Sequence, residues 1–201
     1  MKRRPSKPAG AGERSAAPPK IAGRAVFLVG YMGAGKSTVG RVLARRLNWA
    51  FEDLDDRIEL CEGRSVAEIF RHSGEAGFRR AEEAALQQAL REAREGSAKV
   101  IALGGGAFVP PANAARLKAA GVPTVFLDAP VEELWQRCQK QVSELDAVRP
   151  LLETREGFGE LYQTRLPSYL KAALRVDTSG LRVEEVAEQI VNVLDLEEKR
   201  P

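Results

Sequence analysis

The glycine-rich segment GYMGAGKS, residues 30–37, constrains the fold of this chain more than any other feature. It matches the pattern G-x-x-x-x-G-K-[ST], in which a loop wraps its backbone N–H groups around phosphate. Residues 24–29 before it are an apolar run typical of a buried parallel strand, and residues 36–48 after it carry apolar side chains at helical spacing. Because a strand enters this loop and a helix leaves it, we predict an α/β fold that binds a nucleotide.

The rest of the chain continues this alternation of strands and helices. Apolar runs predict further strands at residues 49–53, 98–103, 122–127 and 174–177. Helical spacing and composition predict helices at residues 55–61, 65–71, 74–95, 113–120, 131–141, 157–172 and 183–196. Residues 142–156 have weak periodicity and contain Pro150, so we expect a mobile loop there. The alternation predicts a parallel sheet with helices on both faces, a three-layer sandwich.

Positive charge is concentrated at the start of the chain. The first 24 residues hold seven basic side chains and one acid, a net charge of +6, against +3 for the whole chain. This segment is rich in Pro, Ala and Gly and has no apolar periodicity, so we predict a disordered basic tail at residues 1–23 and one domain at residues 24–201. An organellar transit peptide and nonspecific contact of the tail with nucleic acid are the alternatives.

Composition also bears on the compartment. No apolar run approaches the roughly 18 residues that span a bilayer, so we expect no membrane segment. Cys61 and Cys138 lie far apart without the spacing of metal ligands. We therefore expect two buried thiols and a reducing cytoplasmic location. Since nothing in the sequence requires a second subunit, we also expect a monomer, and we expect no nucleic-acid partner.

Two residues of the glycine-rich loop carry the predicted phosphate chemistry. Lys36 can reach the β- and γ-phosphates, and the Ser37 hydroxyl can coordinate magnesium. The loop by itself does not separate a kinase from a GTPase or a motor ATPase. The NKxD motif that reads guanine is absent, and 201 residues leave little room for a transducing module. These points favour an ATP-dependent kinase that acts on a small molecule.

Acids and glycines follow the second and third predicted strands, where open parallel sheets bind their ligands. Asp53 and Asp55 lie two residues apart, so an extended chain would aim both carboxylates to one side. One could hold magnesium through water and the other could accept a bond from the attacking hydroxyl. Capping or solvated aspartates are the ordinary alternative, and the adjacent Asp56 is a candidate cap. The glycines at 104–106 permit close backbone approach to a ligand, or form a flexible turn.

Three arginines complete the candidate site. Arg79 and Arg165 could bind an anion, because a guanidinium matches a carboxylate with two hydrogen bonds. Arg149 lies in the predicted mobile loop, from which it could swing over the phosphates. Each would be an ordinary exposed residue if taken alone. Their occurrence together and in this order favours a site that binds an anionic substrate beside ATP.

These segments together resemble the shikimate kinase family. The similarity runs over residues 24–196 and rests on the segments GYMGAGKSTVGR, FEDLDDRIE, GRSVAEIF, GEAGFRRAEE, LGGGA, VRPLL and RLPSY. The resemblance implies transfer of the ATP γ-phosphate to the 3-hydroxyl of shikimate, with Mg²⁺ as cofactor, in aromatic amino-acid biosynthesis. It also implies a P-loop fold whose five parallel strands have the order 2-3-1-4-5, and a mobile lid.

The resemblance assigns a role to each candidate residue. It implies that Lys36, Asp55 and Arg149 are catalytic, and that Ser37 and Asp53 hold the metal. It implies an ATP site made of Gly33, Ala34, Gly35, Lys36, Ser37, Thr38, Arg137 and Arg149. It implies a shikimate site made of Asp55, Arg79, Gly104, Gly105, Gly106 and Arg165.

The sequence departs from the family pattern at three places. After Arg165 it reads Leu-Pro-Ser-Tyr where the family more often has Ala/Asn-Pro-Leu-Tyr, the lid is longer than in compact members, and the tail has no counterpart. None of these departures removes a charged group that the chemistry needs. A gluconate or nucleotide kinase, and a catalytically silent ligand-sensing relative, are the alternatives.

Overall fold

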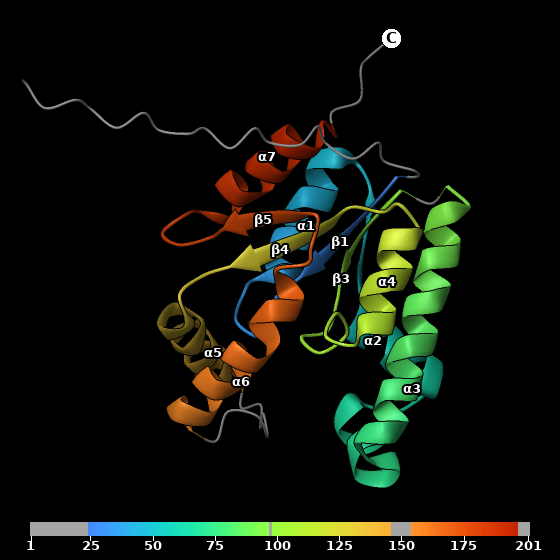
Figure 1. Ribbon diagram of the computed structural model, residues 1–201, viewed down its shortest axis with the longest axis vertical. Coiled ribbons are helices and arrows are strands. Elements are labelled where there is room, and N and C mark those ends of the chain that lie inside the picture. Colours follow the sequence, from blue (N-terminus) through green and yellow to red (C-terminus); the bar gives the residue numbers. More distant parts are fainter. Residues whose placement is uncertain (1–23, 97, 146–153, 197–201) are drawn as a thin grey trace, which may run out of the picture.

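Five parallel strands form a single sheet in the computed structural model, which describes residues 24–96, 98–145 and 154–196 (Figure 1). The order across the sheet is β2-β3-β1-β4-β5, as predicted. The strands are β1 (Ala25–Val29), β2 (Ala50–Asp53), β3 (Lys99–Ala102), β4 (Thr124–Asp128) and β5 (Leu174–Asp177). β1 lies in the middle and is entirely buried, which explains why its sequence is continuously apolar.

Helices cover both faces of the sheet (Figure 1). They are α1 (Lys36–Leu47), α2 (Leu54–Glu62), α3 (Val66–Arg94), α4 (Pro111–Ala119), α5 (Val131–Leu145), α6 (Arg155–Tyr169) and α7 (Val183–Leu194). α1 packs against α7, α2 against α3, and α5 against α6. The predicted three-layer α/β sandwich is therefore confirmed. Across the described ranges, no helix combines the length and the apolar character that crossing a bilayer requires.

α3 contains the break that the sequence predicted between two helices. Gly74 has φ 65° and ψ −177°, outside the helical region, so the chain turns there before the helix resumes. The first part begins with a capping box, in which the Ser65 hydroxyl accepts from the Glu68 N–H and the Glu68 carboxylate accepts from the Ser65 N–H. The bend sets the direction of the second part, which carries Arg79.

The predicted loop at residues 142–156 is too long at both ends. α5 continues to Leu145, because residues 141–145 contain no glycine or proline to end it. α6 begins at Arg155, because the Thr154 hydroxyl caps it by accepting from the Gly157 N–H at 3.0 Å. The middle of the predicted lid lies outside the described residues, as does the predicted tail at residues 1–23.

The two cysteines have different surroundings. Cys138 on α5 is buried, as predicted, whereas Cys61 is exposed. The prediction of a buried thiol is wrong for Cys61 because it stands in the last turn of α2, beyond the buried Leu54 and Ile58.

Candidate active site

The glycine-rich loop joins the end of β1 to the start of α1. Gly33 and Gly35 have φ of 79° and 82°, a region that favours glycine, and Gly35 is the N-cap of α1. The Lys36 ammonium donates to the carbonyls of Gly30 and Tyr31 at 3.0 and 2.9 Å. Ala34 is buried in the loop, and Thr38 is exposed in the first turn of the helix. This arrangement matches a loop that binds phosphate with backbone N–H groups and a lysine.

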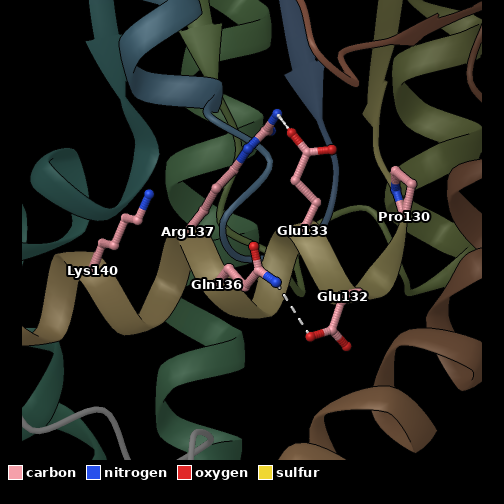
Figure 2. Close-up of a pocket in the computed structure, with 6 residues that line it drawn as sticks. All are labelled: Pro130, Glu132, Glu133, Gln136, Arg137 and Lys140. Atoms are coloured by element: carbon pink, nitrogen blue, oxygen red, sulfur yellow. Dashed lines mark hydrogen bonds and ion pairs between the residues drawn. The ribbon is translucent and has the colours of Figure 1, made fainter.

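α5 closes one side of this loop and carries Arg137. A Cβ on Gly33 would lie 2.8 Å from the Cys138 sulfur, so the loop and the helix are in close contact. Arg137 donates to the side chain and the carbonyl of Thr178, each at 3.1 Å, and forms an ion pair with Glu133 at 2.5 Å. Figure 2 shows Arg137 and Lys140 at a hollow on this helix. The guanidinium is thus held by Thr178 and Glu133, on the helix that contacts the loop.

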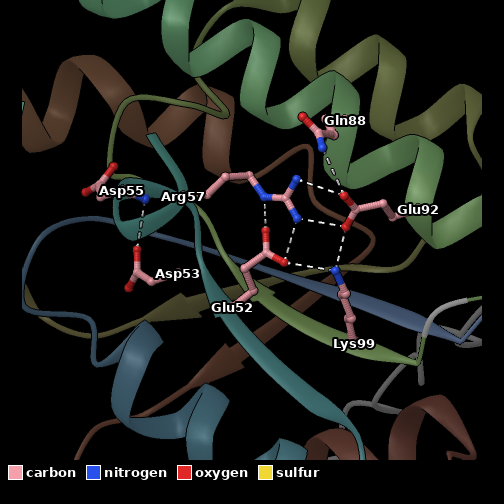
Figure 3. A network of polar contacts seen from close by, with 7 residues as sticks. All are labelled: Glu52, Asp53, Asp55, Arg57, Gln88, Glu92 and Lys99. Carbon is pink, nitrogen blue, oxygen red and sulfur yellow. Dashed lines mark hydrogen bonds and ion pairs between the residues drawn. The ribbon is translucent and has the colours of Figure 1, made fainter. Parts of the chain in front are cut away.

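Asp53 lies at the end of β2 and faces the loop. Its Oδ2 atom accepts a hydrogen bond of 2.5 Å from the Ser37 hydroxyl. Its Oδ1 atom accepts from the Asp55 N–H at 3.1 Å and so caps α2 (Figure 3). The cap is therefore Asp53, and the expectation that Asp56 caps this helix is wrong, because α2 begins at Leu54 and already includes Asp56.

The oxygens of Ser37 and Asp53 fit a magnesium ion. Among the described residues, no three or more His, Cys, Asp or Glu side chains gather to hold a metal. Mg²⁺ does not need such a cage, because it is commonly bound by one or two protein oxygens together with water and substrate phosphates. A hydroxyl and a carboxylate at the foot of the phosphate loop supply that donor set.

Asp55 stands in the first turn of α2 with one oxygen unsatisfied. Its Oδ1 atom is buried and has no hydrogen-bond partner within the described part of the chain. Burial raises the pKa of Asp55 to about 6, and the negative charges of Asp53, Glu82 and Asp56 add to the rise, while Lys36 opposes it. A buried carboxylate oxygen without a partner is a ready acceptor for a ligand hydroxyl.

The glycine turn at residues 104–106 brings three predicted residues together. A Cβ on Gly104 would lie 2.8 Å from the Asp55 Oδ1 atom, and a Cβ on Gly106 would lie 2.9 Å from an Arg79 nitrogen. A Cβ on Gly105 would meet nothing closer than Arg165, at 3.7 Å. The three successive glycines therefore face Asp55, Arg165 and Arg79 in turn. An acid and two guanidinium groups therefore lie next to a turn that has no side chains of its own.

Glu82 belongs to the same group and was missed by the sequence analysis. It is only 1% exposed, and it forms an ion pair with Arg79 at 2.7 Å. Burial raises the pKa of Glu82, and Arg79 opposes that rise. The available signal was its position three residues after Arg79 on a helix, which places the two side chains side by side. Glu82 orients the Arg79 guanidinium toward the glycine turn.

A network of ion pairs holds the segment that carries Asp53 and Asp55. Arg57 on α2 and Lys99 on β3 each contact both Glu52 on β2 and Glu92 on α3 (Figure 3). The hydrogen bonds from Arg57 and Lys99 lower the pKa of Glu92 to about 2. The four side chains join two strands and two helices, so they fix α2 next to the end of β2.

Most of the predicted site residues that the structure describes lie close together. The loop residues, Asp53, Asp55, Arg79, Arg165 and the glycine turn meet at the carboxyl ends of β1, β2 and β3, and Arg137 lies on the far side of the loop. Arg149 lies outside the described residues.

Comparison with known proteins agrees with the fold and the site described above. The family model described as shikimate kinase matches residues 32–195. The shikimate kinase of Thermus thermophilus is 43% identical over 172 residues, which cover 84% of this chain and 89% of that protein. The solved structure of the shikimate kinase from Acinetobacter baumannii in complex with shikimate is 32% identical, with a TM-score of 0.75, and the match covers 88% of this chain and 96% of that one.

Other kinases are similar in fold alone. The gluconokinase from Sinorhizobium meliloti is 15% identical, with a TM-score of 0.54, over 88% of this chain and 94% of that one.

Proposed function

The chain belongs to the shikimate kinase family, and we infer that it transfers the γ-phosphate of ATP to the 3-hydroxyl of shikimate, giving shikimate 3-phosphate and ADP. The observation that carries this inference is the glycine turn, whose three residues face Asp55, Arg165 and Arg79 beside the phosphate loop. Shikimate is a ring that carries a carboxylate and three hydroxyls. Two guanidinium groups and one carboxylate are the complementary groups.

The two arginines orient the substrate. Arg79 and Arg165 bind the shikimate carboxylate through charge-assisted hydrogen bonds. Glu82 and Tyr31 support them, since Glu82 pairs with Arg79 and the Arg165 guanidinium lies over the Tyr31 ring, 5.8 Å from its centroid. Because the carboxylate is remote from the reacting hydroxyl, this clamp decides which hydroxyl faces the phosphate. Orientation of this kind supplies much of the rate enhancement in phosphoryl transfer.

Asp55 receives the proton of the reacting hydroxyl. With a pKa of about 6, Asp55 is mostly ionised above that pH and accepts a hydrogen bond from the 3-hydroxyl. The hydroxyl oxygen bonds to the γ-phosphorus, the bond from phosphorus to the β–γ bridging oxygen breaks, and that oxygen leaves with ADP. The proton passes to the Asp55 carboxylate. Lys36 neutralises charge on the transferred group.

Mg²⁺ is the metal that these residues fit, and Ser37 and Asp53 are the residues that would hold it. When bound, the ion neutralises charge on the β- and γ-phosphates of ATP. Arg149 is proposed to add positive charge from the lid. Arg137 is proposed to lie against the adenine. The cytoplasmic location and the monomeric state expected from the sequence also stay predictions.

Initial rates of ADP release test the function against its alternatives. Purified protein with Mg-ATP is compared with shikimate, gluconate, a nucleoside monophosphate and no acceptor. The proposed function predicts ADP release that depends on shikimate. Release that depends on gluconate or on a nucleoside monophosphate would point to another kinase of this fold, and no release from protein that binds ATP would point to a silent relative.

A further inference from the structure

The carbonyl groups of the glycine turn are all held by hydrogen bonds, but not by the same kind of donor. The Gly104 carbonyl accepts from the Ala107 N–H at 3.0 Å, and the Gly106 carbonyl accepts from the Val109 N–H at 3.1 Å. The Gly105 carbonyl accepts from the hydroxyl of Tyr169, at the end of α6. The middle peptide of the turn is therefore fixed by a side chain from a distant helix.

Tyr169 is itself fixed in place. Its side chain is completely buried, and its ring stacks on Phe126 with centroids 5.3 Å apart and planes inclined by 27°. Burial raises the pKa of Tyr169 well above its usual value, while Arg165 opposes the rise. The phenol therefore keeps its proton at physiological pH and donates a hydrogen bond to the Gly105 carbonyl.

Arg165 lies one turn earlier on the same helix, near enough to the Tyr169 hydroxyl for its positive charge to oppose the rise in the tyrosine pKa. A phenol oxygen can donate one hydrogen bond and accept others, so it can serve the carbonyl and the guanidinium together. A Cβ built on Gly105 would have a guanidinium nitrogen of Arg165 as its nearest neighbour, at 3.7 Å. The Tyr169 hydroxyl is therefore bonded to the glycine turn and lies near the guanidinium that faces this turn.

A run of three glycines needs this support. Glycine has more backbone freedom than any other residue, and the turn has no side chains of its own to pack. Within the described part of the chain, the N–H groups of Gly105 and Gly106 reach no protein acceptor, so they are available to a ligand. Since a peptide is planar and trans, fixing the Gly105 carbonyl fixes the direction of the Gly106 N–H.

We propose that Tyr169 is a positioning residue for the substrate site, which holds the glycine turn and Arg165 in the spacing that the shikimate carboxylate requires. The proposal rests on the proposed function for the identity of the substrate. Tyr169 would not touch the substrate. It would act through Gly105 and Arg165.

The substitution Tyr169→Phe tests this role, because phenylalanine keeps the stacked ring and removes only the hydroxyl. We expect the KM for shikimate to rise about tenfold while the KM for ATP stays within about twofold. The matched control is Tyr162→Phe on the same helix. Tyr162 is also buried, and its hydroxyl donates to Asp128 at 2.8 Å, away from the turn. This control should lose thermal stability without changing the KM for shikimate.

Two results would overturn the proposal. One is a KM for shikimate in Tyr169→Phe that matches the wild-type value while the melting temperature falls as in Tyr162→Phe. The other is a crystal structure of Tyr169→Phe in which the Gly105 carbonyl and the Arg165 guanidinium keep their positions. The crystal structure does not depend on the substrate. If the wild type fails to phosphorylate shikimate, the proposed function fails, and the crystal structure still decides whether Tyr169 positions the turn.

Discussion

The Ser37 hydroxyl donates a hydrogen bond of 2.5 Å to the Oδ2 atom of Asp53. This bond joins the first turn of α1 to the end of β2, so the two oxygens proposed to hold Mg²⁺ are already next to each other. Asp53→Asn keeps an oxygen to cap α2 and removes the negative charge. We expect the Mg²⁺ concentration that gives half-maximal activity to rise by about tenfold or more.

The control for Asp53→Asn is its stability. Asparagine is as good an N-cap as aspartate, so the melting temperature should change by no more than about 3 °C. A variant that is stable and has the Mg²⁺ dependence of the wild type would show that Asp53 does not take part in metal binding.

Arg79→Lys tests the carboxylate clamp without leaving the buried Glu82 uncompensated. Lysine keeps the positive charge but cannot form the two parallel hydrogen bonds of a guanidinium. We expect the KM for shikimate to rise by at least about tenfold, and the KM for ATP to stay within about twofold. Arg80→Lys is the matched control, because Arg80 is adjacent and exposed. Equal increases in both constants for Arg79→Lys would contradict the clamp.

Gly105→Ala tests whether the open side of the glycine turn is the place of the substrate. Gly105 does not have a positive φ, and an added Cβ would meet ordinary contact distances, with 3.7 Å to Arg165 as the nearest. The variant should therefore fold, with a melting temperature within about 3 °C of the wild type. Because the methyl group would occupy the space of the substrate, the KM for shikimate should rise by roughly tenfold or more.

Gly159→Ala is the matched control for Gly105→Ala. Gly159 lies on α6, and an added Cβ would have nothing within 4 Å. Alanine in a helix is more stable than glycine by about 0.5–1 kcal/mol, so this variant should be slightly more stable and equally active. Normal affinity for shikimate in a folded Gly105→Ala variant would place the substrate elsewhere.

We expect Asp55→Asn to lower the turnover of the enzyme and to raise the stability of the folded protein. The folded-state pKa of Asp55, about 6, is raised above the usual 3.8, so the ionised carboxylate destabilises the folded protein above that pH. We expect Asp55→Asn to increase the free energy of unfolding by about 1–3 kcal/mol near pH 7.5, and turnover to fall by about 100-fold. As the pH drops through 6, the wild-type carboxyl takes up a proton and the difference in stability should shrink.

Urea unfolding of both proteins in EDTA, without nucleotide, measures this effect. The difference in unfolding free energy near pH 5 should be well below the difference near pH 7.5. A difference that grows as the pH falls would mean that Asp55 is stabilised as a carboxylate, contrary to its buried position.

The sequence predicts the fold well because its signals are local. The strand before Gly30 and the helix after Lys36 are both signalled by apolar spacing, and the break at Gly74 follows from the glycine itself. The errors also have local causes. Thr154 resembles any loop threonine until its hydroxyl is seen to cap α6, and Cys61 looks like a core residue until α2 is seen to end beside it.

The site is harder to predict where contacts cross the fold. Asp55, Arg79 and Arg165 could be named because the family motifs include them. Tyr169 is different, since its contact with Gly105 joins residues 64 positions apart and no spacing in the sequence signals it. Glu82 lies between these cases, because its distance from Arg79 on the helix was available but its burial was not.

Phosphorus NMR of the product formed from Mg-ATP and shikimate tests the central claim most directly. We predict one new phosphate ester, coupled to the proton on carbon 3 of the ring, in an amount equal to the ADP formed. An ester on another hydroxyl would show that the clamp and Asp55 orient the substrate differently. ADP with inorganic phosphate and no ester would contradict the claim that this chain phosphorylates shikimate.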